Sequence, residues 1–73
     1  MTPRFDSKAL YRALDERRVQ RGLTWQQVAR EMGVAAATIT RTRQGGRMEV
    51  DGMLAMVRWL DVPIETFVRE ISS

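Results

Sequence analysis

The chain contains no cysteine and no histidine. Without thiols it can form neither disulfides nor thiolate metal sites, and without imidazole it lacks the commonest metal ligand and the usual general base. It also lacks an apolar run of membrane-spanning length. The first residues, MTPRFDSK, do not contain the apolar core of a signal peptide. These absences predict a cytoplasmic protein that binds no metal, no cofactor and no membrane.

Catalytic groupings are missing as well. Serine occurs only at Ser7, Ser72 and Ser73, and no histidine is present to activate it. Gly45-Gly46 lacks the Lys-Ser/Thr continuation of a P-loop. We therefore expect no enzymatic activity. With 73 residues, the sequence fits one small domain over residues 1–73 and leaves little room for a small-molecule ligand.

Basic residues exceed acidic ones by 12 to 9, which gives a net charge of +3. Lys8 is the single lysine, so the excess is almost entirely arginine, whose planar fork suits phosphate and guanine edges. A GC-rich genome explains the abundance of arginine equally well. The positions of the arginines are more informative than their number. Arg41, Arg43 and Arg47 lie within seven residues that contain no acid.

Residues 22–45 have the pattern of two short helices joined by a tight turn. Thr24 is suited to cap the first, with Gln27 completing a capping box. Gly33 can adopt the positive φ that ends a helix. We expect helix two over residues 25–32 and helix three over residues 35–44. Two helices across a short turn with glycine form a helix-turn-helix, although an ordinary helical hairpin has the same local pattern.

Specific side chains fill this pattern. They are Leu23-Thr24, Val28-Ala29, Met32-Gly33-Val34 and Thr38-Ile39-Thr40-Arg41. With these residues the chain resembles the phage-repressor-like (Cro/repressor, or xenobiotic-response-element type) helix-turn-helix transcriptional regulators over about residues 10–70. The resemblance implies a lambda-repressor-like domain of bacterial or phage origin. It also implies that the chain binds double-stranded DNA as a homodimer and represses transcription by occupying an operator.

The remaining sequence predicts helices as well, which gives an all-α bundle of five short helices. Residues 1–5 are expected to be a flexible arm, followed by helix one to about Arg21. Helix four should cover residues 50–60 and face the core with Val50, Met53, Leu54, Val57 and Leu60. No strand is expected, because period-two alternation is absent.

A short last helix is predicted after Pro63, whose missing N–H is harmless in a first turn. Its apolar side chains recur at helical spacing and are Ile64, Phe67, Val68 and Ile71. Four large apolar residues in so short a segment have two possible roles. They form either a lid on the core or a dimer interface.

If Ala35, Ile39 and Thr42 face inward, the opposite face of helix three is the surface that family members insert into the major groove. The expected base-contacting residues are Ala36, Ala37, Thr40 and Arg41. The expected backbone-contacting residues are Trp25, Gln26, Arg43, Gln44 and Arg47. For Trp25, packing against helix one is an equally good alternative.

Two alanine features depart from the family pattern. Ala35 stands where relatives usually have a capping Ser or Thr, and Ala36-Ala37 replaces polar residues that read bases. A smooth apolar surface also suits another protein. The second hypothesis is therefore a protein-interaction module, such as an antitoxin-like partner or an adaptor that uses the helix-turn-helix as a scaffold.

Overall fold

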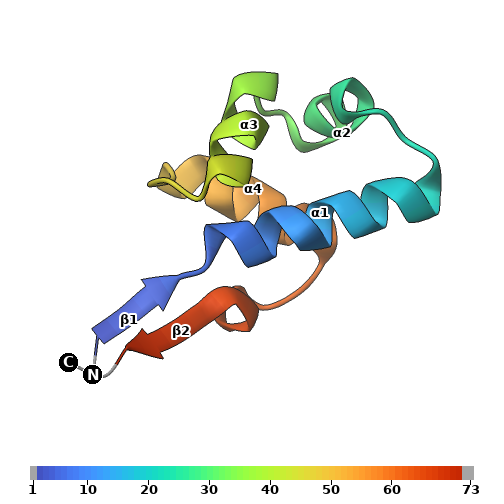
Figure 1. Ribbon diagram of the computed structural model, residues 1–73. Helices are drawn as coiled ribbons and strands as arrows, with labels where there is room; N and C mark the ends of the chain where they lie inside the picture. The colour runs from blue at the N-terminus through green and yellow to red at the C-terminus, as the bar shows by residue number, and fades with distance from the viewer. Residues whose placement is uncertain (1, 72–73) are drawn as a thin grey trace.

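The computed structural model describes residues 2–71, which form four α-helices, one 3-10 helix and a two-stranded antiparallel sheet (Figure 1). In chain order the elements are β1 (Thr2–Phe5), α1 (Ser7–Arg21), α2 (Trp25–Met32), α3 (Ala36–Gln44), α4 (Val50–Leu60), the 3-10 helix η1 (Ile64–Phe67) and β2 (Val68–Ile71). The prediction of an all-α bundle of five helices is therefore wrong. The expected fifth helix is one 3-10 turn followed by a strand. Residues 2–5 of the expected arm form the other strand, and Met1 lies outside the described residues.

Residues next to the ends of α1 and α2 cap these helices. The Asp6 side chain caps α1 by accepting a hydrogen bond from the Ala9 N–H at 2.9 Å. Thr24 and Gln27 form the predicted capping box at the start of α2, with bonds of 3.1 and 2.8 Å. Gly33 ends α2 with φ 74°, in the left-handed region that favours glycine.

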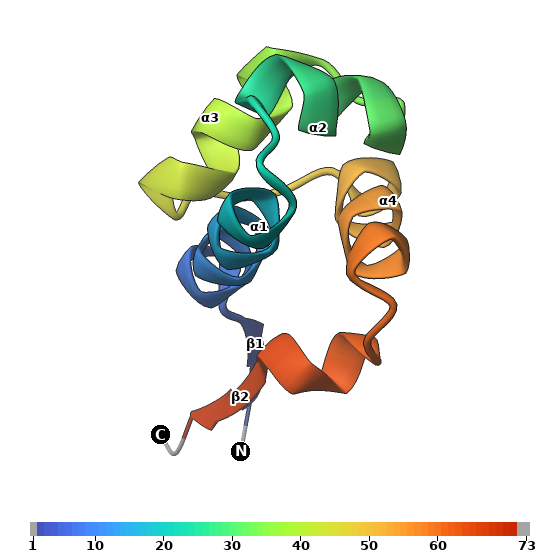
Figure 2. The ribbon, with the colours of Figure 1, turned by 90° about the vertical axis from the view of Figure 1, so that its right-hand side faces the viewer.

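β1 and β2 form a ribbon that projects from the helices and joins the two ends of the described chain (Figures 1 and 2). The register pairs Phe5 with Val68, and the Asp6 N–H donates to the Phe67 carbonyl at 2.7 Å. Phe5 and Phe67 also meet edge to face, with ring centroids 6.0 Å apart. β-branched residues such as Val68 and Ile71 favour strands when a partner is present. That partner comes from the other end of the chain, so the local helical spacing gave the wrong element.

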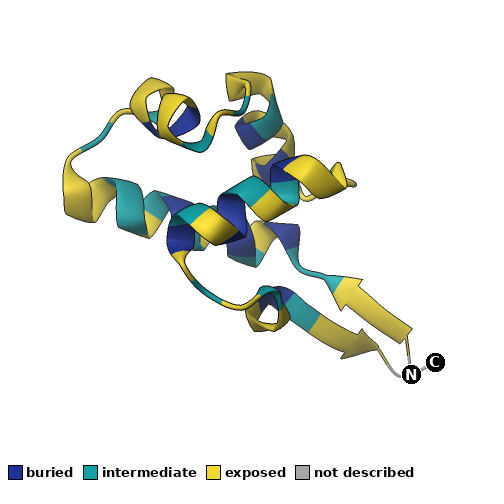
Figure 3. Ribbon diagram, turned by 180° about the vertical axis from the view of Figure 1, so that it is seen from behind, coloured by how far each residue is buried: buried dark blue, intermediate teal, exposed yellow. Residues whose placement is uncertain are grey.

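The core is centred on α1. Leu10 and Leu14 are fully buried, and α1 contacts α3, α4 and η1. The other buried apolar residues are Val28 and Ala29 from α2, Ile39 from α3, Met56, Val57 and Leu60 from α4, and Phe67 from η1. Figure 3 shows these buried positions on the sides of the helices that face one another. The apolar faces of four short helices are thereby joined in one core.

The orientation of α4 differs from the prediction at two residues. Val57 and Leu60 are buried as expected, but the exposed fractions of Val50 and Leu54 are 61% and 44%. Gly52 is buried instead, because α4 meets α3 there: a Cβ on Gly52 would lie 3.1 Å from the Thr38 methyl group. α4 packs against α1 and α2, and the side of the helix that carries Val50 and Leu54 faces solvent.

The ribbon can be tested through Phe5. We expect Phe5→Ala to lower the free energy of unfolding by about 1–3 kcal/mol, because it removes the ring contact with Phe67 and part of the lid on the core. Urea denaturation followed by circular dichroism measures the change. The matched control is Thr2→Ala on the same strand, where an exposed side chain should cost less than about 0.5 kcal/mol. Equal losses for the two variants would contradict the role of the ribbon in the fold.

Candidate functional site

The connection between α2 and α3 is short and well defined. The N–H groups of Gly33 and Val34 both donate to the Ala29 carbonyl, at 2.9 and 3.1 Å. Ala29 itself is only 7% exposed. A small side chain here and a left-handed glycine at the turn allow α3 to leave α2 abruptly. As a result, one side of α3 packs on the core and the other is fully presented to solvent.

The outer face of α3 is smooth and has few polar atoms. Ala36, Ala37 and Thr40 are exposed on it, and Gln44 lies one turn further on. The Thr40 hydroxyl donates to the Ala36 carbonyl of its own helix at 3.3 Å. Ala35 does not face inward as expected: it is the exposed N-cap residue before α3 and makes no side-chain cap bond. The structure thus brings together the predicted alanines and Thr40 on one face. Apart from the Gln44 amide at its C-terminal end, this face has few groups that can form hydrogen bonds.

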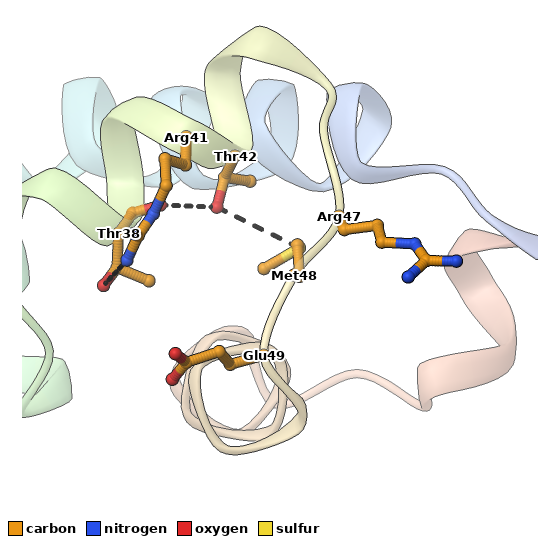
Figure 4. Close-up of a pocket in the computed structure, with 6 residues that line it drawn as sticks. All are labelled: Thr38, Arg41, Thr42, Arg47, Met48 and Glu49. Carbon is orange, nitrogen blue, oxygen red and sulfur yellow. Dashed lines mark hydrogen bonds between the residues drawn. The ribbon is translucent and has the colours of Figure 1, made fainter.

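Arg41 lies at the edge of this face, on the side toward α4. Its guanidinium donates to the Thr38 hydroxyl at 3.5 Å (Figure 4). Both residues line a small cavity of about 100 Å³ that also reaches Glu49. Figure 4 shows that Arg47 points the opposite way, out of this cavity. The two arginines therefore present their charges to different regions of the surface.

Thr42, beneath the same cavity, faces inward as expected and is fully buried. Its hydroxyl donates to the Thr38 carbonyl at 2.9 Å, and the sulfur of Met56 lies 3.7 Å away. The polar group is therefore satisfied inside its own helix, so threonine can occupy a core position here.

The opposite edge of the face lies against α1 and α2. A small groove there is lined by Tyr11, Trp25, Ala36, Ile39, Thr40 and Arg43. The Trp25 ring stacks on Tyr11 at 5.1 Å between centroids, and the Arg18 guanidinium lies 4.9 Å from it. Trp25 thus packs on α1, the alternative that the sequence left open, and only part of its ring borders the groove. Gln26, beside it, is exposed.

Two further cations, Arg4 and Lys8, lie beyond the end of α3 and are not among the residues expected to contact DNA. A shallow groove of about 540 Å³ separates β1 from the loop after α3, and Arg4 and Arg47 both line it. The side chain of Lys8 lies against Gly45, where a Cβ would be 2.6 Å from Lys8 Cε. Within residues 2–71, none of these three cations is ion-paired with a carboxylate. Finding Arg4 required the strand, which local sequence patterns did not predict.

The residues predicted as a dimer interface divide between core and surface. Phe67 is 5% exposed and belongs to the core, and Ile64 and Val68 are half-buried. Ile71, at the end of the ribbon, is 45% exposed. Phe67 and Ile64 therefore pack on the core as a lid, whereas Val68 and Ile71 belong to the ribbon.

A polar cluster on the far side of α2 fixes its position. Glu31 accepts hydrogen bonds from Arg21 at 2.8 and 3.2 Å and from the Trp59 indole N–H at 3.0 Å. These three side chains come from α2, α1 and α4 respectively. The bond from Arg21, followed by that from Trp59, holds the pKa of Glu31 below its usual range.

This cluster predicts an acid-dependent loss of stability. A carboxylate whose pKa is lowered by folding stabilises the fold above its unfolded pKa, about 4.3 for glutamate, and the effect is lost as the pH falls through the lower folded value. We expect Glu31→Gln to be less stable than wild type at neutral pH, and the two curves to converge as the pH falls below about 4.3. Urea denaturation at a series of pH values measures this. Parallel pH curves would contradict the assignment.

Residues 2–71 contain no group of three or more acidic, histidine or cysteine side chains arranged to hold a metal ion. Nor does any helix in this range combine the length and the apolar character that a bilayer crossing requires. Comparison with protein-family models, with curated proteins and with solved structures gives no match. The family resemblance therefore depends on the motif residues alone. The geometry adds an exposed, smooth helix face with cations at both edges and beyond its end.

Proposed function

We propose that the protein is a sequence-specific regulator of transcription that binds double-stranded DNA through α3. In this proposal it binds as a homodimer and represses by occupying its operator. The observation that supports it best is the outer face of α3, which is exposed along its length and flanked by Arg41 on one side and Arg43 on the other. An α-helix fits the major groove, and cations beside it meet the phosphates that line the groove.

The roles proposed for the side chains follow from their positions. Arg43, Arg47, Lys8 and Arg4 contact phosphates, because they lie beside the helix or beyond its C-terminal end. Gln26 and the first backbone amides of α2 contact a phosphate as well. Ala36, Ala37 and Thr40 make apolar contacts with thymine methyl groups. Arg41 is the residue proposed to hydrogen-bond a guanine edge, and it must leave Thr38 to do so.

A selection from a random duplex library with the purified protein, at physiological salt, tests the proposal. A dimeric regulator should enrich a palindromic motif with half-sites about one helical turn, or a multiple of it, apart. Absence of any enriched motif, together with binding that is clear only at low salt, would remove sequence specificity from the proposal. Absence of binding at every salt concentration would reject it.

Arg41 and Arg47 should differ when mutated. We expect Arg41→Ala to cost about 1–3 kcal/mol on the selected site and to relax preference at one base pair. Arg47→Ala should weaken binding to all sequences alike and lower the slope of log K against log salt by about 1. Fluorescence anisotropy on the selected and on a scrambled duplex measures both. Equal loss on the two duplexes for Arg41→Ala would contradict base readout by this residue.

Lys8 provides a test of whether the groove beside the ribbon contributes to DNA affinity. Lys8→Gln should reduce affinity for selected and scrambled duplexes equally, and it should lower the salt slope by about 1, because one phosphate contact is lost. Arg17→Gln is the matched control. It removes the same charge from α1, in a groove that is lined by Leu60 and Phe67 and by no residue of α3. A salt slope changed equally by both variants would indicate only a general effect of net charge.

The alanine-rich face of α3 also supports the alternative, a protein-interaction module. Titration of a GC-rich and an AT-rich duplex at low and at moderate salt separates the two functions. A phosphate-binding protein gains affinity as salt is lowered. Failure to bind either duplex at any salt concentration would favour the protein-interaction module.

A further inference from the structure

The outward side of α4 has an apolar pair that the core does not use. Val50 and Leu54 are 61% and 44% exposed and lie one turn apart. Asp51 and Arg58 are exposed on the same helix. At 100° per residue these four side chains share one face, opposite the buried face that includes Gly52 and Met56. Large apolar side chains that cluster on an exposed face often mark an interaction surface.

The charges on this face have a self-complementary arrangement. Asp51 is in the first turn of α4 and Arg58 in the last. They are seven residues, or two turns, apart and therefore point to the same side, separated by about 10 Å along the axis. Within residues 2–71 neither is ion-paired. The midpoint between them falls between Leu54 and Ala55.

We propose that α4 is a self-association surface on which α4 of a second copy packs antiparallel. A two-fold axis near Leu54 brings the two Leu54 side chains together, with Val50 to either side. The same axis places Asp51 of each copy next to Arg58 of the other, so that two ion pairs form at once. A parallel arrangement would instead place each charge at the level of the like charge of the second copy, so neither ion pair could form, and the pattern therefore specifies both the partner and its direction.

The edges of the β-ribbon are poor alternatives for self-association. Asp6 and Phe67 form a hydrogen-bonded pair, and such pairs alternate with non-hydrogen-bonded pairs along the ribbon. Pro3 belongs to a non-hydrogen-bonded pair, so its backbone nitrogen, which carries no hydrogen, faces the outer edge of β1. On the outer edge of β2, the Val68 N–H bonds to the Glu65 carbonyl and the Val68 carbonyl accepts from Arg69 at 3.3 Å. Few backbone groups are left for a further strand.

This inference rests on the proposed function for its biological role, since it gives the homodimer a surface. The test of the inference is independent of that function, because it needs no DNA. α4 contacts α3 through Gly52, on the side away from Leu54. Pairing of α4 with a second copy therefore leaves the outer face of α3 open.

Disulfide trapping provides the first test, because the chain has no cysteine of its own. Under mild oxidation, Leu54→Cys should form a covalent dimer at least about tenfold faster than Val19→Cys, because a disulfide needs Cα atoms within about 7 Å. Val19 is the matched control, an exposed apolar residue on α1. Equal rates for the two would overturn the proposal. So would fastest trapping at Ile71→Cys, which would place the interface on the ribbon.

A charge exchange tests the ion pairs. We expect Asp51→Arg and Arg58→Asp each to weaken dimerisation about tenfold at low salt, since each loses two attractive contacts and gains two repulsive ones. The double exchange should restore the wild-type constant to within about threefold. Sedimentation equilibrium gives the constants, with circular dichroism to confirm that each variant is folded. Failure of the double variant to recover would overturn the antiparallel pairing. A dimer that forms as described but binds no DNA would reject the proposed function and leave this inference intact.

Discussion

The burial of Leu10 and Leu14 is the interaction on which the rest of the structure depends. Both are fully buried on one stripe of α1, and complete burial of a leucine contributes about 1.5–3 kcal/mol. Because α1 contacts α3, α4 and η1, this stripe sets where each of them lies. Residues at both ends of α1 position other elements. Asp6 leads into the ribbon, and Arg18 and Arg21 hold Trp25 and Glu31 of α2. The orientation of the exposed α3 face is therefore set from α1.

Features decided by neighbours in sequence could be predicted, and features decided by distant contacts could not. The capping box of Thr24 and Gln27 and the left-handed Gly33 depend on a few adjacent residues, and the structure confirms them. The rotation of α4 depends on its packing against α1 and α2 and on the close approach of Gly52 to Thr38, and β2 depends on a strand from the other end of the chain. Hydrophobic spacing alone predicts the wrong exposure for Val50 and Leu54 and the wrong element for Val68 to Ile71.

The same division applies to the candidate site. Periodicity within α3 was sufficient to place Ala36, Ala37 and Thr40 on the exposed face. It could not reveal that Arg41 bonds to Thr38, because rotamer choice depends on the space toward α4. Nor could it decide between the two roles of Trp25, which required the position of Tyr11. Cations from β1 and α1 were missed because they join the site through the tertiary fold.

The alanines on the outer face of α3 have a consequence for the proposed function. In the major groove, one α3 would present few hydrogen-bonding groups to base edges, so a single copy would discriminate weakly between sequences. Two copies held at a fixed distance discriminate also by the spacing and orientation of half-sites, which a monomer cannot sense. In the proposed dimer that distance is set by the contact around Leu54 on α4. Sequence preference would then depend on the geometry of α4 as much as on the side chains of α3.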